Sequence, residues 1–318
     1  MFLFFISYFK IGDDMQMVDG LGIIGGLSLL LYGIHVMSEG LESIVSHQLE
    51  KVLYQLTNKK WKAICVGIVI TALIHSSSAM TVILIGLLNA NMIPLKNALW
   101  VVLGANIGTT ITGQLLAFEI GTYAPIIAFI GVIIFMCIHQ KIGHIIIGIG
   151  LLFMGLEMMS LSLLPLQNSS FFLYFTKLLT HPIMGILVGT LFTAVIQSSS
   201  ASIGILQSLA KVHLLTFQQA TYIIFGFDIG TCITAFIASI SSNHLAKQLA
   251  LFHLLLNVVG TLLFVGICFF TPFISWVEML TPSYIAIQIA NMHTIFNVGT
   301  TLFALCIEDE LIKIIKKI

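Results

Sequence analysis

The sequence has no arginine, and all 13 of its basic residues are lysine. Only 8% of its residues are charged and its formal net charge is zero, whereas a soluble domain carries roughly a quarter charged residues. With 58% hydrophobic residues, this composition predicts an integral membrane protein and excludes a nucleic-acid-binding surface. The missing arginine also removes the usual bidentate clamp for an oxyanion.

Patterns typical of disulfide, metal and barrel proteins are missing too. The five cysteines are scattered through apolar segments without CxxC spacing, which favours packing roles. The apolar runs far exceed the ~10 alternating residues of a barrel strand, so we expect an all-α membrane protein. The apolar opening, residues 1–9, is too short to span and lacks the basic start of a signal peptide. Since Met15 and Met17 follow closely, it stays open whether residues 1–16 belong to the native protein.

Two apolar segments, 63–93 and 183–212, are about 30 residues long, although a single spanning helix needs only ~20 residues. Each is predicted to be two half-helices that meet at central serines, a re-entrant hairpin. One long tilted helix with small packing residues is the alternative, but the interruption recurs at the matching position of both halves. The other candidate spans are 21–40, 98–118, 122–138, 144–164, 216–240, 246–271 and 283–307.

The serines belong to an internal duplication. Ser76–Ser78 and Ser198–Ser200 are 122 positions apart, within the matching stretches GIVITALIHSSSA and GTLFTAVIQSSSA. At the same offset LLLYGIHVMSEGL matches LLFMGLEMMSLSL, and GANIGTTIT matches GFDIGTCIT. Shared apolar composition would not align the glycine, serine and threonine positions. We therefore divide the chain into transmembrane repeat 1 (20–142), repeat 2 (143–271), and a final helix with a short tail (272–318).

Lysine placement predicts that the repeats are inverted. Segment 41–62 holds four lysines, whereas its equivalent, 163–182, holds only Lys177. By the positive-inside rule the first segment is cytoplasmic and the second external. Tracing onward places the C-terminus in the cytoplasm, and it places Lys10, Lys177 and Lys211 outside.

The serine repeats suit the binding of an anion together with a small cation. Serine is a favourable N-cap residue, and a helix N-terminus offers free N–H groups and the positive end of a dipole to an anion. The carbonyls that end the preceding half-helices, with nearby hydroxyls, suit Na⁺.

The second motif, G-x-[ND]-I-G-T-x-I-T, follows the same logic. Its glycines permit a broken helix or a close helix approach, and Asn106/Asp228, Thr109/Thr231 and Thr112/Thr234 offer oxygen ligands along roughly one helix face. Ordinary packing is the alternative. Asp228 is the one acidic residue well within a span, which makes it a cation-site or proton-site candidate; a protonated or hydrogen-bonded structural carboxyl is the other reading.

Histidines add further polar positions. His75 stands where the second repeat has Gln197, and it either donates to an anion, carries a proton, or fills the polar role of glutamine. The pairs His253/Asn257 and His293/Asn297 each share a helix face. We expect them chiefly to pack helices together, and secondarily to line the transport domain.

QSSSA and GANIGTT in duplicated halves, with a final helix containing Phe296-Asn297, resemble the type II sodium–phosphate cotransporter family over about residues 20–307. The resemblance implies a cell-membrane symporter, not an enzyme, that carries inorganic phosphate into the cell with Na⁺ by alternating access. Such a symporter needs no cofactor besides the coupling ion. The resemblance leaves undecided whether the protein forms a homodimer. The implied phosphate ligands are His75, Ser76, Ser77, Ser78, Ser198, Ser199 and Ser200; the implied sodium ligands are Gln197, Asn106, Thr109, Thr110, Asp228 and Thr231.

The sequence departs from the family pattern at two presumed ligands, with His75 for glutamine and Asp228 for asparagine. Many bacterial relatives continue into a PhoU-like helical domain, and this sequence stops at Ile318 without one. A symporter for another oxyanion, or one driven by protons through His75 and Asp228, is the alternative function. An intramembrane serine hydrolase is remote, because His75 and Ser76 are helix neighbours that do not face each other.

Overall fold

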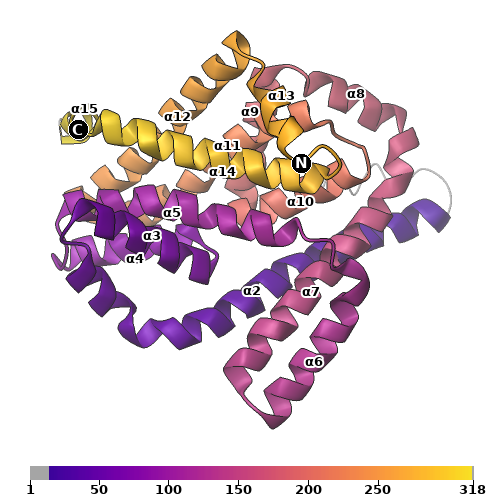
Figure 1. Ribbon diagram of the computed structural model, residues 1–318, viewed down its shortest axis with the longest axis horizontal. Helices are drawn as coiled ribbons and strands as arrows, with labels where there is room; N and C mark the ends of the chain where they lie inside the picture. Colours follow the sequence, from indigo (N-terminus) through magenta and orange to yellow (C-terminus); the bar gives the residue numbers. More distant parts are fainter. Residues whose placement is uncertain (1–13, 317–318) are drawn as a thin grey trace.

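The computed structural model describes residues 14–316, and in that range the chain contains helices and no strand (Figure 1). The long helices are α2 (Asp14–Leu56), α5 (Leu95–Leu116), α7 (Gln140–Leu163), α11 (Phe217–Ser239), α12 (His244–Phe270) and α14 (Ile285–Cys306). The shorter α-helices are α3 (Lys60–Ile74), α4 (Ser77–Asn89), α6 (Ala124–Cys137), α8 (Ser170–Leu178), α9 (Pro182–Ile196), α10 (Ser199–Lys211), α13 (Phe273–Leu280) and α15 (Glu308–Lys316). The apolar opening and Lys10 lie outside the described residues.

Six helices in the described range are long and apolar enough to cross a membrane, namely the apolar part of α2 and helices α5, α7, α11, α12 and α14. The two 30-residue apolar stretches do not form single helices. The first is divided into α3 and α4 and the second into α9 and α10, each time at the serines. The predicted interruption is therefore present at the same place in both halves.

Helices α2, α7 and α6 form a side arm beside the rest of the molecule (Figure 1). Gly33 and Gly155 allow α2 and α7 to touch backbone to backbone: a Cβ on Gly33 would overlap the backbone at Leu152, and one on Gly155 would overlap the backbone at Leu30. Small residues are the usual means of close helix approach in membranes. The predicted span 21–40 is part of the much longer helix α2. The short helices α8, α13 and α15 were not predicted from the sequence.

Of the two roles expected for the glycines of the second motif, the broken helix is wrong, because α5 and α11 run through the motif without interruption, and the close helix approach is confirmed. Its glycines bring helices together instead. A Cβ on Gly104 would overlap the carbonyl oxygen of Ile64 on α3, and a Cβ on Gly226 would overlap that of Ile186 on α9. The same contact therefore joins α3 to α5 and α9 to α11.

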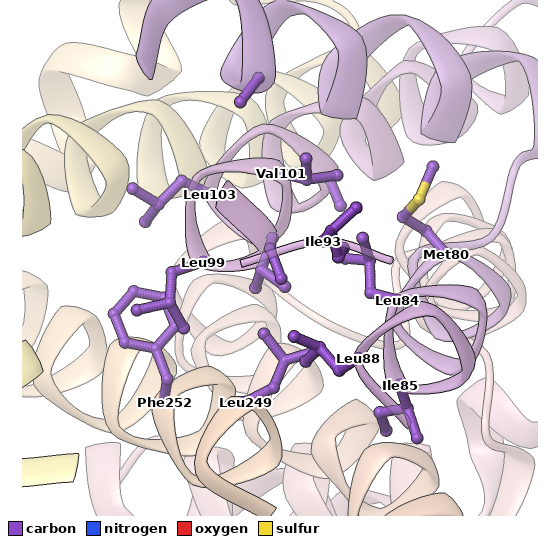
Figure 2. Packing of buried hydrophobic residues seen from close by; sticks show 14 of the residues in the cluster. Met80, Leu84, Ile85, Leu88, Ile93, Leu99, Val101, Leu103, Leu249 and Phe252 are labelled. Carbon is purple, nitrogen blue, oxygen red and sulfur yellow. The ribbon is translucent and has the colours of Figure 1, made fainter. Parts of the chain in front are cut away.

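Apolar side chains of both halves pack around these pairs. Figure 2 shows Met80, Leu84 and Leu88 of α4 packed against α5 and against Leu249 and Phe252 of α12. All of these side chains are almost fully buried. Helix α12, in the second half of the chain, thus covers the first broken helix.

Glu308, at the start of α15, ties the C-terminal helix to the first half. Its carboxylate contacts the Nζ atom of Lys60 and accepts a 2.9 Å hydrogen bond from Nε1 of Trp100, with Lys96 Nζ at 3.9 Å. Burial opposes ionisation of Glu308, but hydrogen bonds from Lys60 and Trp100 and the charges of Lys60 and Lys96 outweigh it and hold the pKa of this carboxyl below its ordinary value.

We predict that Gly104→Ala destabilises the protein by roughly 1–3 kcal/mol, because the new methyl group must push α3 away from α5. The matched control is Gly86→Ala in α4, where a Cβ meets nothing within 4 Å; there alanine leaves stability unchanged or raises it, since glycine is the poorer helix former. Thermal unfolding in detergent measures both. Equal melting temperatures for the two variants contradict the close packing.

We predict that Glu308→Gln lowers the free energy of unfolding by roughly 1 kcal/mol at pH 7. Because the folded-state pKa is lowered, the stabilisation exists above the unfolded pKa of about 4.3 and disappears as pH falls through the folded value. The gap in melting temperature between variant and wild type should therefore close in acid.

Glu310→Gln on the same helix is the control, since the Glu310 and Lys313 side chains are 69% and 64% exposed. It should leave the melting temperature unchanged. An equal loss in both variants, or a Glu308→Gln deficit that persists in acid, would show that the Glu308 contacts do not stabilise the fold.

Candidate functional site

Both helix breaks have the same backbone conformation. His75 and Gln197 adopt left-handed φ angles of 57° and 60°, and each donates its N–H to the threonine four residues earlier. Ser76 and Ser198 then cap the next helices, accepting hydrogen bonds from the N–H groups of Ala79 and Ala201. Left-handed φ is uncommon for residues other than glycine. The sequence repeat is thus a repeat of backbone geometry, and the predicted N-cap serines are confirmed.

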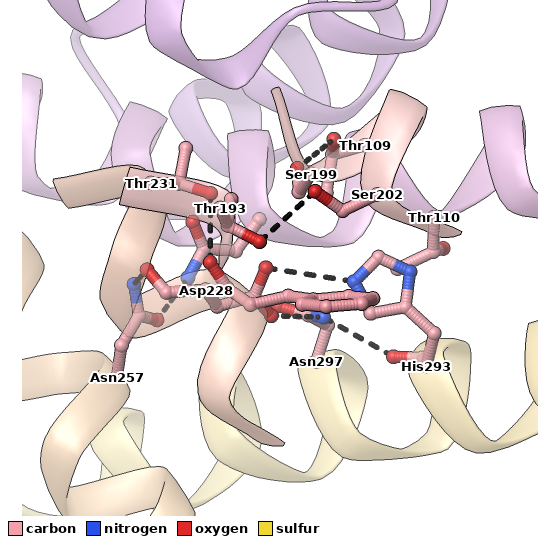
Figure 3. A network of polar contacts seen from close by, with 12 residues as sticks. Thr109, Thr110, Thr193, Ser199, Ser202, Asp228, Thr231, Asn257, His293 and Asn297 are labelled. Carbon is pink, nitrogen blue, oxygen red and sulfur yellow. Dashed lines mark hydrogen bonds and ion pairs between the residues drawn. The ribbon is translucent and has the colours of Figure 1, made fainter. Parts of the chain in front are cut away.

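The two breaks lie next to each other. Ser200 Oγ, at the start of α10, donates a 3.3 Å hydrogen bond to the carbonyl of His75, at the end of α3. Ser199 Oγ lies 3.4 Å from Thr109 Oγ1 of α5 (Figure 3). The His75 ring turns to α5, with Nδ1 2.8 Å from Thr112 Oγ1. Serines from one half therefore meet the broken helix and the second motif of the other half.

Asp228 lies in a buried polar network beside these breaks (Figure 3). Its side chain is about 5% exposed, and its Oδ2 accepts a 2.8 Å hydrogen bond from Nδ2 of Asn297. Nε2 of His293, which is fully buried, lies 3.5 Å from Oδ1. The ion pairs of lysines among the described residues are with Glu308 and Glu310. The carboxylate therefore faces polar neighbours and no fixed positive charge.

Asn106, the repeat equivalent of Asp228, is held in a similar way from another helix. Its Oδ1 lies 3.2 Å from His253 Nε2, and its Nδ2 donates a 2.7 Å hydrogen bond to Oδ1 of Asn257. The two His/Asn pairs thus lie in the site, one against each motif. Interhelical packing was predicted to be their main role; the structure also places them on the candidate ligands.

The remaining predicted residues are less central. The Thr110 and Thr231 hydroxyls are buried and donate to backbone carbonyls of their own helices. Ser77 is buried and Ser78 half-buried, whereas the Gln197 side chain is exposed. The structure therefore brings together His75, Asn106, Thr109, Ser199, Ser200 and Asp228, and it does not bring Gln197 into the buried network.

Thr193 and Ser202 were not predicted. Thr193 Oγ1 donates a 3.0 Å hydrogen bond to Ser202 Oγ (Figure 3). Ser202 Oγ in turn donates to the carbonyl of Ser198, so these bonds join the helices before and after the second break. Their positions four residues from a predicted break residue were the available signal, since residues four apart share a helix face.

The arrangement can bind an anion and a cation side by side. The starts of α4 and α10 present first-turn N–H groups and positive dipole ends, each equivalent to about half a charge. Hydroxyls, an amide and a carboxylate are hard oxygen ligands suited to a small cation. Residues 14–316 contain no group of three histidine, cysteine or acidic side chains that could hold a transition metal.

Comparisons with known proteins agree with this chemistry. The family model described as Na⁺/Pi-cotransporter matches residues 29–161 and 157–271. The two matches correspond to the two halves of the chain. The site and fold thus define a membrane transport protein with a duplicated core. The chain belongs to the Na⁺/Pi-cotransporter family, and its six apolar helices make it a multi-pass membrane protein.

Individual relatives cover different parts of the chain. YqeW of Bacillus subtilis is 31% identical over 71% of this chain and 76% of its own length. YjbB of Escherichia coli K12, named as an inorganic phosphate export protein, is 28% identical over 73% of this chain. The human sodium-dependent phosphate transport protein 2B is 33% identical over 33% of this chain. This chain spans less than half the length of YjbB, 44%, and 16% of the human protein. No solved structure matches it.

Proposed function

We propose that the protein is a sodium-coupled symporter of inorganic phosphate that works by alternating access in the cell membrane, with its C-terminus in the cytoplasm. The observation that carries the proposal is the hydrogen bond from Ser200 to the carbonyl of His75. Through it, the N-terminus of α10 in the second half of the chain meets the break that precedes α4 in the first half. The printed names of the family and of the human relative point to the same substrates.

The proposed architecture is a pair of inverted-topology repeats in which α3–α4 and α9–α10 are re-entrant hairpins. The lysine asymmetry and the matching left-handed residues support it. Phosphate would bind between the two hairpin tips, at His75 and the two serine triplets. Sodium would bind beside it, at Asn106, Thr109, Thr110, Asp228 and Thr231; Gln197, which the sequence motif predicted as a sixth ligand, has an exposed side chain.

Sodium supplies charge that the protein lacks. Two helix N-termini together offer about one positive charge, which does not neutralise a divalent phosphate and the Asp228 carboxylate. A buried unpaired anion is costly. A co-bound Na⁺ therefore stabilises both anions, which gives a physical reason for coupling.

Export is the second candidate, because YjbB carries that name. A symporter moves both solutes the same way, so an inward Na⁺ gradient favours import. Proton coupling through His75 and Asp228 and transport of another oxyanion are the further alternatives.

We predict that proteoliposomes containing the protein accumulate radiolabelled phosphate when an inward Na⁺ gradient is imposed at equal pH, and do not when only a pH gradient is imposed. Asp228→Asn should lower Na⁺-driven uptake by about tenfold or more, because the amide cannot offset the charge of the cation. Asn291→Asp, outside the predicted ligands, is a control with the opposite change of charge; it keeps the oxygen that accepts from Gln114 and should leave uptake unchanged. Uptake that depends on the pH gradient and not on Na⁺ would show that the coupling ion is the proton and would contradict sodium coupling.

A further inference from the structure

Asn257, on α12, lies between the two repeat-equivalent residues Asn106 and Asp228. It is 1% exposed. Its Nδ2 donates a 2.9 Å hydrogen bond to the backbone carbonyl of Asp228 and lies 3.2 Å from the sulfur of Cys232. Its Oδ1 accepts the 2.7 Å hydrogen bond from Asn106. One side chain therefore joins the second motif of the first half to that of the second half.

The bonds that run from Asp228 through Asn257 and Asn106 to His253 form a hydrogen-bond relay. The backbone carbonyl at the Asp228 end fixes the donor and acceptor of each bond. A backbone carbonyl only accepts, so the amide nitrogen of Asn257 must face Asp228. The Asn257 oxygen then faces Asn106, which must present its own nitrogen. The Asn106 oxygen in turn accepts from Nε2 of His253, so that nitrogen carries the ring proton. Nδ1 of His253, on the far side of the ring, has no partner among the described residues.

This relay decides where the candidate cation ligands point. It turns the Asn106 oxygen toward His253 with one lone pair left for a cation. At its other end it holds the main chain of Asp228, whose carboxylate contacts His293 and Asn297. Movement of one motif relative to the other must therefore break the Asn257 bonds or carry the other motif along.

We propose that each motif copy binds a sodium ion and that Asn257 is a positioning residue which couples the two copies, so that a cation bound at one copy fixes the ligand geometry at the other. The inference rests on the sodium coupling proposed above and adds the residue that makes sodium binding cooperative. Partners that orient ligands in this way typically change ion affinity 10–100-fold when they are lost.

Asn257→Asp is the discriminating variant, because a carboxylate has nearly the same shape but cannot donate to the Asp228 carbonyl. Phosphate uptake is measured against Na⁺ concentration. The wild type should show a Hill coefficient above one. In the variant we expect this coefficient to fall toward one and the half-saturating Na⁺ concentration to rise about tenfold, while half-saturating phosphate at saturating Na⁺ stays within about twofold.

Asn291→Asp on α14 is the matched control. The Asn291 oxygen accepts a 3.2 Å hydrogen bond from Gln114, and aspartate keeps that acceptor. Its Na⁺ curve should match the wild type. Asn257→Ser removes the bridge without adding charge and should repeat the Asn257→Asp result.

The difference in melting temperature between NaCl and choline chloride reports Na⁺ binding, even for a variant that does not transport phosphate. Smaller stabilisation by Na⁺ in both Asn257 variants supports the proposal. The proposal is overturned if Asn257→Asp and Asn257→Ser fold and match the wild type in Hill coefficient, half-saturating Na⁺ concentration and stabilisation by Na⁺. Failure of sodium coupling is seen separately, as wild-type uptake and melting temperature that do not respond to Na⁺ at all.

Discussion

The left-handed backbone at His75 and Gln197 is the constraint on which the rest of the site depends. A residue in this conformation ends a helix, and the serine that follows starts a new one with its cap already made. Each long apolar stretch therefore contains a helix C-terminus and a helix N-terminus in its interior. Without these two residues the serines would lie within continuous helices, with their N–H groups already bonded and unable to bind an anion.

Polar groups without fixed positive charge surround the ends created in this way. The candidate anion ligands are N–H groups and hydroxyls, and the candidate cation ligands are hydroxyls, one amide and one carboxylate. Two His/Asn pairs at matching spacing support the amide and the carboxylate from α12 and α14. The positive charge of such a site is not permanent, because it comes from a mobile cation that can enter and leave with the anion. Arginine, permanently charged and bidentate, would hold an anion in place.

Much of this could be predicted from sequence, because the physical signals were local. Apolar runs too long for one helix, interrupted at the same place twice, predict breaks at the two serine triplets, and the structure places the left-handed residues His75 and Gln197 directly before them. At the second motif the sequence left two roles open for Gly104 and Gly226, a helix break and a close helix approach. Glycine permits a break and a close helix contact equally, and only the position of α3 or α9 decides between them.

The sequence could not predict which residues the two His/Asn pairs contact, namely the partners of His253, Asn257, His293 and Asn297. Their spacing shows that each pair shares a helix face, but not which helix that face meets. The structure shows one pair against Asn106 and the other against Asp228, residues up to 151 positions away. Gln197 is the reverse case: its motif predicted a ligand, and its side chain lies outside the buried network.

The central claim is that sodium supplies the charge with which this site binds phosphate. Equilibrium binding of radiolabelled phosphate to the purified protein, in NaCl and in choline chloride at equal ionic strength and pH, tests it most directly. Phosphate should bind in NaCl, and its affinity should collapse in choline chloride. Comparable phosphate affinity in the two salts would contradict the account.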